Sequence, residues 1–245
     1  MTTSDDQITI QTHDGGAMPA YIARPQAGRG PGLVLLQEIF GITDYIKSRA
    51  RDLASLGYVT VVPELYWRIG PHITTDETTE AGLQEAFGYF GKLDVPRAVD
   101  DAVAAFEHVR SMPETGGRAG VMGFCLGGRL AYEVGVASDP DVVVSYYGAG
   151  TADRLDVAPN VECPIIFQFG EADSYLPPEQ AARIREAFAS RPASEVHMHA
   201  GAGHAFDNFR SPMFYHRQAA EDAWPQTRAF LQRYYPTEAV AASAR

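Results

Sequence analysis

The chain has 245 residues, 45% of them hydrophobic, and carries a formal net charge of −11 at pH 7. This acidic balance argues against nucleic acid and against an anionic membrane surface as partners, because both attract a positively charged protein face. The length favours a single domain over residues 1–245.

The predicted elements begin with a hairpin over residues 8–25, where an Asp-Gly-Gly turn joins two short strands. Apolar runs typical of strands covered on both faces follow at residues 32–38, 58–64, 119–124, 141–148 and 164–170, and a last strand is expected at 195–201. Amphipathic segments of helical period lie at 44–57, 95–112, 126–137, 178–190 and 215–235. The alternation predicts an α/β fold with a mostly parallel sheet, an antiparallel amino-terminal edge and helices on both faces.

Two segments lie outside this alternation. Residues 68–87 form the most polar and turn-rich interior region, which we expect to cover part of a site, and residues 236–245 are expected to be a flexible tail. There is no secretory signal pattern and no apolar run of about 18 residues. The cysteines, Cys125 and Cys163, offer neither a disulfide framework nor zinc-ligand spacing. We therefore expect a cytoplasmic protein in which Cys163 is structural.

A cysteine occupies the centre of a motif typical of nucleophiles in α/β-hydrolases. Gly123-Phe124-Cys125-Leu126-Gly127 follows a predicted strand and precedes a predicted helix, which is the context that this motif requires. Glycine at the outer positions avoids collisions in the sharp turn, and the first amides of the helix favour a thiolate at Cys125. The alternative is a cysteine packed in a tight turn, since free cysteine is often buried.

Two further side chains complete a candidate triad. Asp173 follows the strand 164–170 and His204 follows the strand 195–201, in the chain order nucleophile, acid, histidine. Both lie at carboxyl ends of strands, where open α/β sheets collect their ligands. An imidazole can take the thiol proton, and a carboxylate fixes its tautomer. Taken singly, Asp173 could instead shape a turn and His204 could be an ordinary loop residue; His197 and His199 compete with it but lie inside the strand.

The loop after the strand 32–38 supplies an oxyanion amide in α/β-hydrolases. The N–H groups of Ile39 and Leu126 are therefore the expected oxyanion donors. Glu38 in the same loop is unusual, because a fixed negative charge would oppose the reaction; it must move away or hold a proton. Four aromatic side chains are expected to line the substrate pocket, although such residues are as often core as contact: Phe40, Trp67, Tyr146 and Tyr147.

Six motifs occur together, in this order: QEIFG, PELY, GFCLGGRLAY, SYYG, GEAD and GHAF. In this combination the chain resembles the dienelactone hydrolase (carboxymethylenebutenolidase) family, from about residue 7 to residue 236. The resemblance implies an α/β-hydrolase fold with a triad of Cys125, Asp173 and His204. It also implies that Glu38 pairs with the resting thiol and takes its proton when substrate binds.

The resemblance departs from the family pattern where substrate is bound. Family members that cleave dienelactone hold its carboxylate with two arginines; the first falls in residues 74–87, which contain none, and the second corresponds to Asn208. A serine after the histidine is replaced by Ala205. Arg68 and Arg210 lie nearby in sequence, either as substitutes or as surface charges. The missing arginines predict weak discrimination in favour of a carboxylate on the substrate.

These patterns lead to two functional hypotheses. The first is a hydrolase that cleaves a lactone or carboxylic ester through a cysteine nucleophile and a thioester, without cofactor or metal, on a small-molecule substrate. The second is a non-catalytic small-molecule-binding or redox-sensing protein on the same scaffold, because a fold alone does not determine function. The sequence leaves the oligomeric state open, with a monomer slightly favoured over an oligomer.

Overall fold

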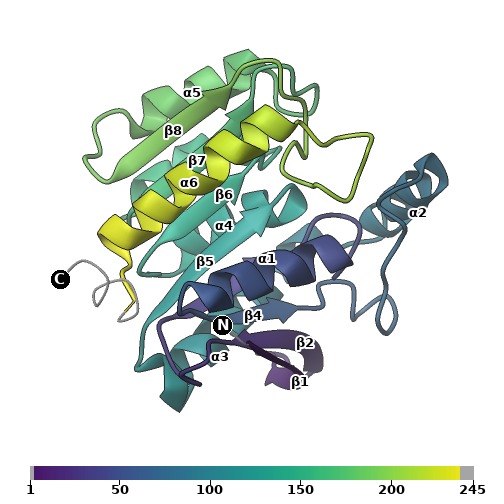
Figure 1. The fold of residues 1–245 in the computed structure, drawn as a ribbon, viewed down its shortest axis with the longest axis vertical. Coiled ribbons are helices and arrows are strands. Elements are labelled where there is room, and N and C mark those ends of the chain that lie inside the picture. Colours follow the sequence, from purple (N-terminus) through teal and green to yellow (C-terminus); the bar gives the residue numbers. More distant parts are fainter. Residues whose placement is uncertain (1–2, 238–245) are drawn as a thin grey trace.

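The computed structural model of the protein describes residues 3–237, in which one eight-stranded sheet has the order β1-β2-β4-β3-β5-β6-β7-β8 (Figure 1). The strands are β1 (Ser4–Gln11), β2 (Ala17–Arg24), β3 (Gly32–Leu36), β4 (Val59–Pro63), β5 (Ala119–Phe124), β6 (Val143–Tyr146), β7 (Ile165–Gly170) and β8 (Ser194–His199). Strand β2 pairs antiparallel with both β1 and β4, and the remaining pairs are parallel. The predicted α/β fold with an antiparallel edge is therefore confirmed.

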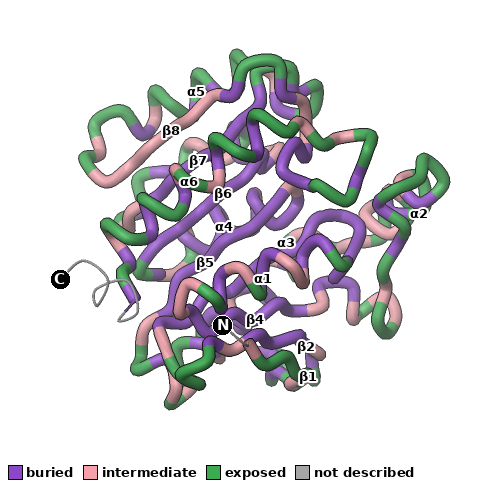
Figure 2. Tube along the Cα trace, viewed as in Figure 1, coloured by how far each residue is buried: buried purple, intermediate pink, exposed green. Residues whose placement is uncertain are grey.

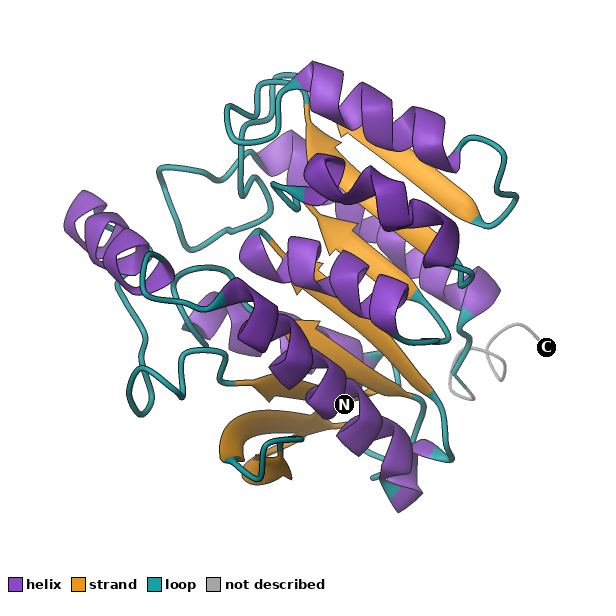
Figure 3. Cartoon of the chain, turned by 180° about the vertical axis from the view of Figure 1, so that it is seen from behind, coloured by secondary structure: helices purple, strands orange, loops and turns teal. Residues whose placement is uncertain are grey.

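Helices cover both faces of the sheet, as Figures 1 and 3 show from opposite sides. Helices α1 (Asp44–Ser55) and α6 (Arg217–Tyr234) pack into one apolar core. Helices α3 (Val95–Ser111), α4 (Leu126–Ala137) and α5 (Pro178–Phe188) pack into the other. Two 3₁₀ segments, η1 (Pro113–Thr115) and η2 (Thr151–Asn160), join these elements. Among the helices within residues 3–237, none combines the length and the apolar character needed to cross a membrane.

The central strands are apolar along their whole length because each has a core on either side. In β3, Val34 and Leu36 enter the core beneath α3 and α4, while Leu33 and Leu35 enter the core beneath α1 and α6. The buried centre of the sheet and the exposed outer surfaces of the helices are visible in Figure 2. Because both faces of these strands are buried, apolar and polar residues do not alternate along them.

A helix that was not predicted begins within residues 68–87 and extends to residue 90. Helix α2 (Glu80–Phe90) begins where the Thr79 hydroxyl accepts a hydrogen bond of 3.1 Å from the N–H of Gly82. It projects away from the sheet (Figure 1). Its apolar side chains, Leu83, Phe87 and Phe90, pack against the edge of the core on the α3 and α4 side of the sheet.

The carboxyl-terminal residues were expected to be flexible from 236 onward. Pro236 and Thr237 instead contact the fold: the Pro236 carbonyl accepts a bond of 3.2 Å from Arg118, and the Thr237 hydroxyl donates one of 2.8 Å to the Leu56 carbonyl. These bonds tie the end of α6 to neighbouring loops, which corrects the prediction for these two residues. The rest of the predicted tail, 238–245, lies outside the described residues.

Candidate active site

The parallel strands bring four polar side chains to one edge of the sheet. Glu38 follows β3, Cys125 follows β5, Asp173 follows β7, and His204 follows β8. All four strands run in the same direction, so their carboxyl ends meet at this edge. The topology therefore gathers residues that are up to 166 positions apart in the chain (204 − 38).

Cys125 stands in a strained turn between β5 and α4. Its φ of 54° and ψ of −116° are outside the regions that side-chain-bearing residues prefer. A Cβ atom on Gly123 would lie 2.0 Å from the Gly127 carbonyl oxygen, and one on Gly127 would lie 2.2 Å from the Leu36 carbonyl oxygen. The turn can close only with glycine at both positions, as the motif predicts, and it presents the thiol at the end of β5.

The thiol, the imidazole and one carboxylate form a continuous chain of contacts. The His204 Nε2 atom lies 3.0 Å from Cys125 Sγ, and its Nδ1 lies 2.8 Å from Asp173 Oδ2. The other Asp173 oxygen accepts hydrogen bonds from the N–H groups of Tyr175 and Leu176, at 2.8 and 3.1 Å. Asp173 is therefore fixed by the backbone and in turn orients the imidazole.

The electrostatic surroundings favour a protonated His204. Burial alone would lower the pKa of the imidazole, but the negative charge of the Cys125 sulfur and the bond to Asp173 outweigh it, and the pKa is raised. Rings of Tyr147 and Tyr175 lie against the imidazole, with centroids 5.3 and 4.9 Å away. The arrangement places a positively charged imidazolium in contact with the Cys125 sulfur.

A buried ion pair anchors the loop that carries His204. Asp207 accepts two hydrogen bonds of 2.8 Å from the Arg49 guanidinium of α1, and one from the Tyr45 hydroxyl. Asp207 is fully buried, and Arg49 is also stacked over the Trp224 ring at 4.4 Å. This anchor was not predicted, because its members are far apart in the sequence.

Glu38 takes part in a buried acid pair. One amide group, the Asn208 Nδ2, donates to Glu38 Oε2 at 2.8 Å and to Glu77 Oε2 at 3.1 Å. Both carboxyl groups are buried, and Glu38 Oε1 has no hydrogen-bond partner among residues 3–237. The pKa of Glu38 is raised to about 8, mainly because the group is buried and secondly because of the negative charge of Glu77. The hydrogen bond from Asn208 lowers this pKa but does not offset the two other effects. Glu38 is therefore mainly protonated at neutral pH.

This arrangement differs from the pairing that the family resemblance implies. In the described part of the chain Glu38 makes no hydrogen bond to Cys125, whose sulfur contacts His204 instead. Asn208, at the position where the resemblance implies an arginine, donates its amide N–H to Glu38 and holds this carboxyl group beside Glu77.

The two expected oxyanion donors are available. Neither the Ile39 N–H nor the Leu126 N–H donates a hydrogen bond to another residue within 3–237. Leu126 is the first residue of α4, where backbone N–H groups have no partner inside the helix. Both residues border the same cavity as Cys125 and His204. Their role as an oxyanion hole is consistent with this placement.

The cavity beside the thiol has a volume of about 110 Å³ and a mainly apolar wall. Its lining residues are Glu38, Ile39, Phe40, Leu83, Phe87, Phe90, Cys125, Leu126, Arg129, Ala149, Tyr175, His204, Ala205 and Phe214. Leu83, Phe87 and Phe90 come from α2, and their spacing of four and three is the helical signal that could have identified them. The prediction that residues 68–87 cover part of a site agrees with their position.

Of the four aromatic residues expected in the pocket, only Phe40 lines this cavity. Trp67 instead donates its indole N–H to Asp101 at 2.9 Å, beneath the Arg68 guanidinium. Tyr146 and Tyr147 are fully buried in the core under α6 and the His204 loop. The expectation for these three is wrong: the Tyr146 and Tyr147 rings lie in the core and the Trp67 ring lies against Asp101 of α3, away from the cavity.

Arg68 and Arg210, considered as substitutes for the missing family arginines, do not line the cavity either. Arg68 forms ion pairs with Asp14 and Asp101, both at 2.8 Å, and does not border the cavity. Arg210 is exposed. Within residues 3–237 there is no group of three His, Cys, Asp or Glu side chains that could hold a metal ion.

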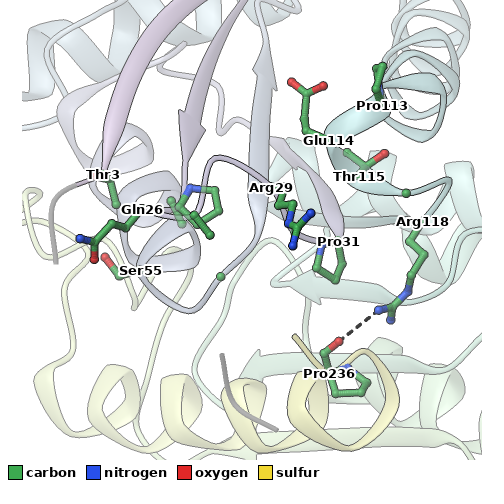
Figure 4. Close-up of a pocket in the computed structure, with 16 residues that line it drawn as sticks. Thr3, Gln26, Arg29, Pro31, Ser55, Pro113, Glu114, Thr115, Arg118 and Pro236 are labelled. Atoms are coloured by element: carbon green, nitrogen blue, oxygen red, sulfur yellow. Dashed lines mark hydrogen bonds between the residues drawn. The ribbon is translucent and has the colours of Figure 1, made fainter. Parts of the chain in front are cut away.

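A larger cavity of about 800 Å³ lies at the opposite edge of the sheet (Figure 4). Pro31, Gly57 and Arg118 in its wall precede β3, β4 and β5, so it opens at the amino ends of the strands. It contains none of the triad residues. Although this cavity is larger than the one beside Cys125, it is therefore not the candidate active site.

Comparisons with known proteins agree with this geometry. The model of the dienelactone hydrolase family matches residues 18–235. Carboxymethylenebutenolidase from Pseudomonas sp. (strain P51) is 36% identical over 229 residues, 94% of this chain and 95% of that protein. Carboxymethylenebutenolidase 1 from Cupriavidus pinatubonensis is 34% identical over 209 residues, 85% of this chain and 89% of that protein.

Solved structures show the same fold. A protein from Klebsiella pneumoniae assigned to the dienelactone hydrolases superposes with a TM-score of 0.83 at 26% identity, covering 96% of this chain and all of that one. A dienelactone hydrolase-like promiscuous phosphotriesterase, P91, from metagenomic libraries superposes with a TM-score of 0.78 at 22% identity, covering 94% of this chain and 99% of that one. The matched family model spans most of the chain, including every element that carries the site, and the chain therefore belongs to the dienelactone hydrolase family.

Proposed function

We propose that this protein hydrolyses a lactone or a carboxylic ester, with Cys125 as nucleophile and a thioester of Cys125 as intermediate. The observation that carries this proposal is the chain of contacts from Asp173 through His204 to the Cys125 sulfur. The names of the relatives, carboxymethylenebutenolidases, support the same class of substrate.

In the first half of the reaction the Cys125 thiolate attacks the carbonyl carbon of the substrate, and the thiol proton resides on His204. The carbonyl oxygen becomes an oxyanion that the N–H groups of Ile39 and Leu126 are placed to bind. The C–O bond of the ester then breaks, and the leaving oxygen takes the proton from His204 Nε2. A lactone opens to a thioester that still carries its own leaving group.

In the second half a water molecule gives a proton to His204 and attacks the thioester carbon. The C–S bond breaks, the carboxylic acid product leaves, and the Cys125 thiolate is restored beside a protonated His204. Asp173 stays ionised throughout, because it stabilises the imidazolium and fixes its tautomer. The cycle consumes one water and needs no oxidant or reductant.

Glu38 acts in this scheme as a neutral acid. A protonated carboxyl group beside the oxyanion does not oppose the development of negative charge, whereas a carboxylate would. Its burial next to Glu77, whose charge disfavours a second one, supports this role. The thiol proton then passes to His204, because a protonated Glu38 cannot accept it.

The test compares hydrolysis of p-nitrophenyl acetate and of an unsaturated γ-lactone by the wild type and by Cys125→Ala. We expect the variant to lose at least a thousandfold in kcat/KM, and mass spectrometry of the acid-quenched wild type to detect an acyl group on Cys125. Cys163→Ala is the matched control, since Cys163 is half-buried at the start of β7 and burial raises the pKa of its thiol to about 12. Equal rates for Cys125→Ala and the wild type would reject the proposal.

A further inference from the structure

The cavity beside Cys125 contains a single lysine or arginine among the described residues that line it, Arg129. Arg129 lies one turn of α4 beyond Cys125, and its backbone N–H donates a bond of 3.2 Å to the Cys125 carbonyl. Its side chain shares the cavity wall with Cys125 and His204. A cation in this position lies within the space that a substrate would occupy beside Cys125.

Among residues 3–237 the Arg129 side chain has no hydrogen-bond or ion-pair partner. Within residues 3–237 no carboxylate pairs with it, and its Nε atom is shielded from solvent without a hydrogen-bond acceptor. By contrast, Arg49 and Arg68 each hold two carboxylates. A shielded guanidinium N–H without an acceptor is unfavourable. In a chain with 31 acidic residues, this missing partner indicates that the acceptor comes from a ligand.

The backbone opposite Arg129 makes room for the guanidinium. Gly150, after β6, has a φ of 90°, and a Cβ atom there would lie 2.9 Å from Arg129 Nη1 and 3.2 Å from its Cζ. The loop therefore depends on a residue without a side chain to accommodate the extended arginine. This packing places the guanidinium instead of leaving it free on the surface.

We infer that Arg129 binds a carboxylate carried by the substrate, so that the cavity selects anionic lactones or esters; this inference rests on the proposed function. The planar guanidinium can hold both oxygens of a carboxylate through paired N–H groups. The protonated state of Glu38 removes one negative charge of the cavity wall that would repel such a substrate, and the charge of the Cys125 thiolate is balanced by the His204 imidazolium 3.0 Å away. Arg129 thus supplies a cation on α4, although residues 74–87 and position 208 lack the expected arginines, and we expect a stronger preference for a carboxylate than the sequence predicts.

The test measures kcat/KM for two unsaturated γ-lactones that differ only in one substituent, a carboxylate or a carboxamide. We expect the wild type to prefer the carboxylate by about tenfold to hundredfold, and Arg129→Gln to lose at least tenfold of that preference. If Arg129→Gln does not fold, Arg129→Met is used in its place, because methionine keeps a long unbranched side chain without the charge. Arg210→Gln is the matched control, since it removes an exposed positive charge near Asn208 and should retain the preference.

An unchanged preference in the folded Arg129 variants would overturn the inference, and so would loss of the preference in Arg210→Gln. Wild-type protein that hydrolyses neither these lactones nor p-nitrophenyl acetate would instead refute the proposed function. In that case calorimetric titration with the carboxylate lactone still tests Arg129, because Arg129→Gln must weaken its binding at least tenfold. Equal affinities of variant and wild type would exclude Arg129 as the anchor.

Discussion

Replacement of Glu38 by glutamine should change how the stability of the protein depends on pH. Glu38 has a pKa of about 8 in the folded protein, compared with an ordinary value of 4.5. The folded protein therefore binds this proton more tightly than the unfolded chain does. The stabilisation is complete below pH 4.5, declines as the pH rises, and is lost as the pH passes the folded value near 8.

The magnitude follows from these two pKa values. Between pH 5.5 and pH 9 the wild type should lose about 3 kcal/mol of unfolding free energy through this one group. Glutamine has a similar shape and does not titrate. The unfolding free energy of Glu38→Gln, relative to that of the wild type, should therefore rise by about 3 kcal/mol between pH 5.5 and pH 9. The charged and titratable groups that act on Glu38 (Glu77, His204 and Asp207) are present in both proteins, so their own effects largely cancel.

Urea unfolding followed by circular dichroism at pH 5.5, 7 and 9 measures this difference directly. Glu85→Gln, which removes an exposed carboxylate from α2, is the matched control and should show a flat difference. If the difference between Glu38→Gln and the wild type is equally flat, Glu38 is not a buried neutral acid. The assignment of its role in catalysis would then fail with it.

Three further predictions concern the support of the site. Asp173→Asn should lower kcat for p-nitrophenyl acetate by roughly a thousandfold or more, since the amide no longer stabilises the imidazolium, and a loss below tenfold would contradict the triad. Gly123→Ala should lower the unfolding free energy by about 3 kcal/mol or more, because the new methyl group meets backbone at 2.0 Å, whereas Gly88→Ala, with open space on α2, should raise the melting temperature slightly. Arg49→Met should cost about 3–5 kcal/mol in urea unfolding, because Asp207 is left buried without its cation; an effect under 1 kcal/mol would show that the ion pair does not anchor the His204 loop.

Local sequence determined the main elements and the positions of the candidate triad. Strands with a core on each face must be apolar throughout, and so their runs are visible without a structure. The turn at Cys125 closes only when Gly123 and Gly127 lack side chains, which leaves a readable motif. Asp173 and His204 follow strands, and the parallel order of those strands brings them to the same edge.

Tertiary structure decided what surrounds those residues. Whether an aromatic side chain at the end of a strand enters the core or the cavity depends on the local backbone, such as the φ of 37° at Tyr147, which no spacing reveals. The partners of Glu38, and the absence of a partner for Arg129 in the described part of the chain, likewise depend on which distant segments come together. Sequence pattern records which residues must be small or apolar at one place in the chain, whereas charge, protonation and substrate selectivity arise only when several parts of the chain meet.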